Sequence, residues 1–174
     1  NKGAQAAQSD WVAYTDDDCR AHVDWACELK KHLAGSRAKA VGGPNLPPDP
    51  HGWQEAVAGV APGAATHVML DDARAEHLPG CNLVLHRQTL LKLGGFDPRF
   101  RAAGDDVDLC WRLLDAGEIM EFCPDAIVWH LPRPKLLGYL RQQWGYGRAE
   151  ALLREKHPQR FSDDGAARWN GTVY

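Results

Sequence analysis

The residues Asp10-Trp11-Val12-Ala13-Tyr14-Thr15 run directly into Asp16-Asp17-Asp18. The first six are apolar, aromatic or β-branched for the most part, so they predict a buried strand that ends in an acidic loop. Side chains alternate along extended backbone, so Asp16 and Asp18 should point one way and Asp17 the other. Two carboxylates on one side repel each other unless a cation compensates, and Mg²⁺ or Mn²⁺ suits such a pair.

The acidic loop has two other interpretations. A solvated turn that caps the following helix would explain the same three aspartates. A metal-dependent phosphohydrolase with an aspartate nucleophile is also possible, but such enzymes usually have Thr or Val two residues beyond the second aspartate. This chain has Arg20 there, so the phosphohydrolase is the less favoured interpretation.

Strand-like and helical patterns alternate along the rest of the chain. The helix over 105–116 has the clearest pattern, because its apolar residues share one face and Gly117 follows it. Residues 42–80 are interrupted by Gly and Pro and predict a loop beside a site. The alternation predicts an α/β architecture with a mostly parallel sheet. Further strands are expected over 38–41, 81–86, 118–122 and 126–129, and further helices over 21–33, 88–93 and 135–156.

Composition excludes several classes of protein. The chain has 174 residues, of which 44% are hydrophobic and 25% charged, as in one ordinary globular domain. A net charge of −3 gives no electrostatic reason to expect binding to nucleic acid or to an anionic membrane. The five cysteines have no metal-site spacing and are expected to be reduced, buried thiols in a cytoplasmic protein. Because no initiator Met is present, we expect the chain to be a piece of a longer protein.

A second acidic cluster begins the helix over 105–116. Capping explains one carboxylate but not the three of Asp105, Asp106 and Asp108, so a general base could lie among them. Taken without the first cluster, these residues would more often mark a structural helix start. His130 follows an apolar strand and could complete a metal site with Asp18, although a lone histidine is more often simply packed.

Aromatic residues in the last predicted helix have two interpretations. Trp144, Tyr146 and Arg148 could line a sugar or lipid site. At helical spacing such residues more often belong to the core, which is the expectation adopted here.

Several blocks in order resemble family 2 glycosyltransferases. The first is an Asn-x-Gly start followed by an apolar strand and a DxD loop, and the others are glycine-rich or acidic motifs in the same order as in the family. The matching residues are Asn1 and Gly3, 11–18, 80–87, 94–97, 104–113 and 124–130.

This resemblance implies an inverting enzyme with a GT-A-like (Rossmann-like) mixed sheet flanked by helices. Residues 1–134 would form the second half of the catalytic domain, with the metal- and acceptor-binding part, and residues 135–174 a C-terminal helical extension. The reaction moves a sugar from a nucleotide-diphosphate donor to a hydroxyl of a saccharide or lipid-linked acceptor, in polysaccharide or glycoconjugate biosynthesis. A lipid-linked acceptor would bring the protein to the inner membrane face as a peripheral protein.

The resemblance also implies residue roles. Asp16 would lie near the donor ribose or the metal, and Asp18 would hold Mn²⁺ or Mg²⁺ with His130. Asp17 and Asn82 are counted with the donor-binding residues. The acidic pair would act on the acceptor, with Asp106 as the catalytic base and Asp105 in place of the family's usual Glu.

The main alternative is a non-catalytic GT-A-like module that binds a sugar, a nucleotide or a partner chain. Such a module would tolerate loss of Asp18 or Asp106, and both are present. Residues 141–144 match the QxxRW motif of processive synthases only in part, because no Arg precedes Trp144. Processive synthesis is therefore not supported.

Overall fold

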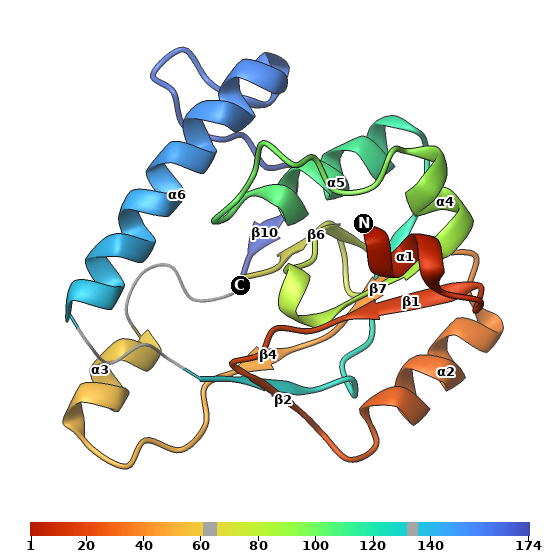
Figure 1. Cartoon of the computed structure of the whole chain (residues 1–174), viewed down its shortest axis with the longest axis horizontal. Helices are drawn as coiled ribbons and strands as arrows, with labels where there is room; N and C mark the ends of the chain where they lie inside the picture. The colour runs from red at the N-terminus through yellow and green to blue at the C-terminus, as the bar shows by residue number, and fades with distance from the viewer. Residues whose placement is uncertain (61–65, 132–135) are drawn as a thin grey trace.

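The computed structural model describes residues 1–60, 66–131 and 136–174. Three small sheets form the centre of the molecule and helices surround them (Figure 1). The largest sheet has the strand order β1-β7-β3-β8, and β7 runs antiparallel to both of its neighbours, whereas β3 and β8 are parallel. Its strands are β1 (Trp11–Tyr14), β7 (Leu83–His86), β3 (Ala40–Gly42) and β8 (Met120–Phe122).

This arrangement confirms the expected mixed sheet and shows that a mostly parallel sheet was the wrong prediction. The strand over 83–86 lies between β1 and β3 and runs in the opposite direction to both. The segment that connects β3 to β7 is not a single crossover helix. It is long and contains further short strands. The alternating helical and strand-like patterns in the sequence do not show that β7 lies between β1 and β3 in the antiparallel direction.

Two three-stranded sheets complete the fold. One consists of β2 (Cys19–Ala21), β9 (Val128–His130) and β4 (Asn45–Leu46), and the other of β10 (Thr172–Val173), β5 (Val68–Met69) and β6 (Ala75–His77). The segment 42–80, expected to be loop-rich, has long stretches without regular structure, but it also holds the short strands β4, β5 and β6 and the helix α3 (Trp53–Val60), which the sequence did not indicate. Strands of two or three residues are too short to show an alternating pattern. Part of that predicted loop, 61–65, lies outside the described residues.

The predicted helices are present with shifted ends. They are α2 (Trp25–Gly35), α4 (Arg87–Lys92), α5 (Asp105–Asp115) and α6 (Leu136–Lys156), preceded by the short α1 (Lys2–Ala6). The helix expected from residue 21 begins only at Trp25, because Ala21 pairs with Val128 in the β2–β9 ladder. Val23 is 90% exposed, and Leu29 is the buried residue of α2.

The core lies between the four-stranded sheet and α4 and α5, and a second cluster joins α5 to α6 and the C-terminal tail. Cys81, Cys110 and Cys123 are buried as expected, but Cys19 is only half-buried and Cys27 is exposed. The segment expected as a helical extension packs on this core. Beyond α6 it contains a 3₁₀ turn (Pro158–Arg160) and β10, which pairs with β5.

A buried carboxylate ties these parts together. Asp108 on α5 is fully buried, and it accepts hydrogen bonds from Arg112, Lys156 and His157 at 2.7 to 2.9 Å. Arg112 also donates to the carbonyls of Leu93 and Gly95. Burial raises the pKa of Asp108, but the three donors outweigh it and hold the pKa below its usual value. Both Asp108 oxygens are thus engaged by side chains that hold α5 to the end of α6.

Replacing Asp108 by Asn is expected to lower the free energy of unfolding at neutral pH by about 3–5 kcal/mol, since the cations lose their buried counter-charge. The pKa of Asp108 is lower in the folded state than in the unfolded state, where it is about 4. The stabilisation is therefore fully present above about pH 4, and it is lost as the pH falls further, through the folded-state pKa. Urea unfolding at neutral and at acidic pH measures the effect. The exposed Asp163→Asn variant is the control, and equal stability of the two variants at neutral pH would contradict the prediction.

Candidate active site

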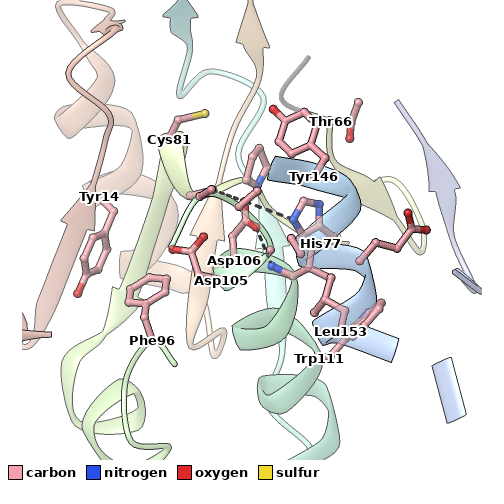
Figure 2. Close-up of a pocket in the computed structure, with 18 of the residues that line it drawn as sticks. Tyr14, Thr66, His77, Cys81, Phe96, Asp105, Asp106, Trp111, Tyr146 and Leu153 are labelled. Carbon is pink, nitrogen blue, oxygen red and sulfur yellow. Dashed lines mark hydrogen bonds and ion pairs between the residues drawn. The ribbon is translucent and has the colours of Figure 1, made fainter. Parts of the chain in front are cut away.

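A pocket of about 790 Å³ opens beside the ends of β1 and β9, between α5 and α6 (Figure 2). Charged and apolar residues share its lining. The charged and polar ones include Asp16, His77, Asp105, Asp106 and His130, and the apolar ones include Trp111, Leu153, Phe161 and Trp169.

The first polar group lies where β1 ends. The ligand atoms of Asp16, Asp18, Cys19 and His130 all lie within 4.8 Å of one another. Pairing of β2 with β9 sets Cys19 opposite His130, and His130 Nε2 lies 3.6 Å from Asp18 Oδ1. Asp17 is exposed and outside this cluster.

The chemistry of this cluster suits a hard cation. Desolvation and the neighbouring Asp18 carboxylate raise the pKa of Asp16, which is the crowding that a bound cation relieves. Burial raises the pKa of the Cys19 thiol, so it stays protonated at neutral pH and is a poor ligand. Two carboxylates and one imidazole remain, which is a donor set that Mn²⁺ or Mg²⁺ accepts.

The second polar group lies at the start of α5. Asp106 Oδ2 accepts a hydrogen bond of 3.0 Å from the Gly80 N–H, and Oδ1 accepts one of 2.8 Å from the Val107 N–H. His77 Nε2 lies 3.7 Å from Asp106 Oδ2. Burial raises the pKa of Asp106, but the imidazole and the two backbone donors outweigh it, so the net shift is downward.

Asp105 behaves in the opposite way. Burial and the negative charge of Asp106 raise its pKa, and Asp16 from the first polar group adds to the shift. The two acidic groups identified in the sequence are therefore close enough to act on one another. Figure 2 shows Asp105 on the side of Tyr14 and Phe96, and Asp106 on the side of His77.

Several pocket residues had no signal in the sequence. His77 lies on β6, in the segment expected only to form a loop beside a site, and Trp169 lies in the tail after α6. The Asn1 side chain is bonded to the backbone of Phe96, with its Oδ1 accepting at 2.8 Å and its Nδ2 donating at 2.7 Å. This contact joins the Asn-x-Gly start to the Gly-Gly-Phe-Asp motif, which the sequence shows as separate blocks.

Other expected residues lie elsewhere. Asn82 is fully buried, and its side chain is bonded to the Trp25 indole and to the carbonyls of Pro44 and Ala126. Its amide thus holds loops together and does not line the pocket. Trp144 is 73% exposed and Arg148 is exposed, so the expectation that they belong to the core was wrong. Tyr146 lines the pocket.

The fold is that of GT-A glycosyltransferases, as two solved structures show. A mannosyltransferase, PcManGT from Pyrobaculum calidifontis in complex with GDP-Man and Mn²⁺, matches with a TM-score of 0.61 and 19% identity over 89% of this chain and 42% of its own. GalNAc-T7 with UDP, GalNAc and Mn²⁺ matches with a TM-score of 0.53 and 18% identity over 81% of this chain and 32% of its own. The expected fold class is confirmed.

The model of glycosyl transferase family group 2 matches residues 11–163, and the chain belongs to this family. Pre-mycofactocin glycosyltransferases from two strains of Mycobacterium tuberculosis, CDC 1551 / Oshkosh and ATCC 25618 / H37Rv, are 29% identical to it over 170 residues. The match covers 92% of this chain and 35% of each relative, so the chain spans about a third of the length of the curated relatives it matches. The resemblance found in the sequence is confirmed.

Proposed function

We propose that the protein carrying this chain is an inverting glycosyltransferase that moves a sugar from a nucleotide-diphosphate donor to an acceptor hydroxyl. The observation that carries the proposal is the meeting of two acidic groups in one pocket, the Asp16–Asp18–His130 cluster and the Asp105–Asp106 pair. Such a transfer requires that the enzyme neutralise the charge of the leaving diphosphate and remove a proton from the acceptor hydroxyl. Residues 1–134 would supply both, with one wall of the pocket coming from residues 135–174.

Asp16, Asp18 and His130 would hold Mn²⁺ or Mg²⁺. When bound, the cation supplies positive charge that stabilises the diphosphate as it leaves. The proposal draws support from the donor chemistry of the cluster and from the Mn²⁺ in both solved relatives.

Asp106 would accept the acceptor's proton. The acceptor oxygen forms a bond to the anomeric carbon from the face opposite the diphosphate. The bond from that carbon to the diphosphate oxygen breaks, and its electron pair leaves with the diphosphate. The Gly80 and Val107 N–H groups hold the Asp106 carboxylate in place and ionised. Asp105 would contact the acceptor from the adjoining position.

The acceptor is proposed to be a saccharide carried on a lipid. Leu137, Leu140 and Trp144 follow helical spacing on α6 and are 81%, 53% and 73% exposed. Arg141 and Arg148 are also exposed on this helix, and the sequence has no acidic residue from 126 to 149. An apolar face with cations beside it suits an anionic lipid surface. No helix within the described ranges is long and apolar enough to span a bilayer, so contact would be peripheral.

Replacing Asp18 by Asn is expected to weaken Mn²⁺ binding by about tenfold or more, which is about 1.4 kcal/mol, because one cation ligand is lost. Asp17→Asn is the matched control, since Asp17 lies outside the cluster. Calorimetric titration of the chain with Mn²⁺ and a nucleoside diphosphate measures both. Equal losses in the two variants would reject the assignment.

Replacing Asp106 by Asn in the full-length protein is expected to lower kcat about 10²–10⁴-fold, because a positioned base contributes that much. Donor affinity should stay nearly unchanged, since the base acts on the acceptor. Asp105→Asn should instead act mainly on the KM for the acceptor. Near-normal turnover of Asp106→Asn, or loss of donor binding as severe as in Asp18→Asn, would exclude Asp106 as the base.

Replacing Trp144 by Ala is expected to weaken binding to phosphatidylglycerol vesicles by about 30-fold, since a buried large side chain contributes about 2 kcal/mol. Co-sedimentation of the chain with vesicles measures this. Val23→Ala is the control, because Val23 is equally exposed but lies outside α6. If vesicles of phosphatidylcholine alone bind as well as anionic ones, the proposed role of the arginines is wrong.

A further inference from the structure

His77 on β6 has a buried ring nitrogen that makes no hydrogen bond within the described residues. The residue is 6% exposed, and this nitrogen is Nε2. Buried side-chain polar atoms in folded proteins are nearly always paired. The nearest charged group is the Asp106 carboxylate at 3.7 Å, and both residues line the pocket. An unpaired nitrogen facing the proposed base calls for a chemical explanation.

The surroundings of His77 are fixed by the C-terminal tail. The Trp169 indole lies against the imidazole with ring centroids 5.7 Å apart. The next residues of the tail are bound to the fully buried Glu76, which accepts hydrogen bonds from the N–H groups of Asn170 and Gly171 at 2.7 and 2.9 Å. His77 is therefore covered on the tail side by an aromatic ring that is held in place.

Few charged groups act on this imidazole. Asp106 faces it from α5, and His67, just before β5, interacts with it electrostatically. Glu76 precedes it on β6 and is engaged by the tail and by Arg160. On the far wall of the pocket α6 presents Glu150. The Asp106 carboxylate is thus the anion placed to exchange a proton with His77.

His77 and Asp106 lie close together but share no direct hydrogen bond. Two other histidines of this chain bond directly to carboxylates, His32 to Glu121 at 2.9 Å and His157 to Asp108 at 2.8 Å. The 3.7 Å from His77 Nε2 to Asp106 Oδ2 is longer than such a bond. In a neutral imidazole with its lone pair on Nε2, this nitrogen can accept a proton once Asp106 is protonated.

We propose that His77 relays the acceptor's proton away from Asp106, an inference that rests on the proposed function and on Asp106 as its base. The proton moves from the acceptor hydroxyl to Asp106, then from the Asp106 carboxyl to Nε2 of neutral His77. This leaves an imidazolium beside a carboxylate, and water takes the proton before the next turnover. His77 acts through Asp106 and does not touch the sugar.

The energetics favour this direction. An ordinary imidazole holds a proton more tightly than an ordinary carboxylate. Burial raises the pKa of Asp106, and a hydrogen bond and then charge attraction from a protonated His77 are the influences that lower it most. That attraction stabilises the state in which the proton lies on His77. The proton transfer to His77 therefore returns Asp106 to its ionised form without moving the carboxylate.

The test uses His77→Gln in the full-length protein, with His77→Asn as a second replacement and His32→Gln as the matched control. His32 also pairs with a carboxylate, but it lies outside the pocket. The relay predicts a fall in kcat of about 10-fold to 100-fold with unchanged donor KM, below or at the lower end of what a direct acid or base contributes, because His77 acts through Asp106. It also predicts that the acid limb of the pH profile of kcat disappears in both His77 variants. Unchanged kcat and pH profile with Asp106→Asn inactive would overturn the relay and leave the proposed function standing.

A measurement on this chain needs no activity. In ¹⁵N-labelled protein, the Nε2 resonance of His77 should have the position of an unprotonated ring nitrogen at neutral pH, and it should move in Asp106→Asn but not in Asp163→Asn. An Nε2 that is protonated at neutral pH, or one that does not respond to Asp106→Asn, would overturn the relay. Full activity of Asp106→Asn would instead reject the base itself. Melting temperatures and circular dichroism of each variant separate these outcomes from misfolding.

Discussion

Asp108 lies fully buried on α5 and accepts hydrogen bonds from Arg112, Lys156 and His157, so that one carboxylate joins α5 to the end of α6. A buried carboxylate is costly unless cations surround it, and these cations must therefore stay near it whenever the chain is folded. Arg112 also donates hydrogen bonds to the carbonyls of Leu93 and Gly95, which connects Asp108 to the turn after α4. The direction of α5, and with it the position of the acidic pair at its start, follows from this contact.

The acidic pair shows how neighbours on one helix acquire different chemistry. Both carboxylates stand in the first turn of α5 and both feel the same helix dipole, so the dipole does not separate them. Their partners do. Asp106 receives two backbone N–H groups and the His77 imidazole, whereas burial and the charge of Asp106 dominate at Asp105. One carboxylate is thus kept ionised while the other holds a proton more readily, which is the division that acid–base sites use.

Local patterns in the sequence identified β1, α5, α6 and the two acidic groups, because each is encoded by consecutive or helically spaced residues. They did not reveal the antiparallel insertion of β7 or the short strands within 42–80, which depend on pairing between distant segments. Asp18 and His130 were linked in the sequence only by residue type, and the β2–β9 ladder is what brings them together. His77 and Trp169 could not be found in this way, because their contact exists only after the tail folds back.

The two walls of the pocket are held by different kinds of contact. The carboxylate wall depends on side chains with fixed partners, so a change at Asp106 or His77 alters the chemistry directly. On the tail, the clamp to Glu76 uses the N–H groups of Asn170 and Gly171 and the Asn170 side-chain amide, and a Cβ at Gly171 would meet the Met69 carbonyl. None of these contacts uses the Trp169 side chain. The side chain at position 169 can therefore change while the tail stays in place. Under the proposed function, a change at position 169 alters the surroundings of His77, whereas the position of the Asp106 carboxylate depends on its own backbone partners, Gly80 and Val107.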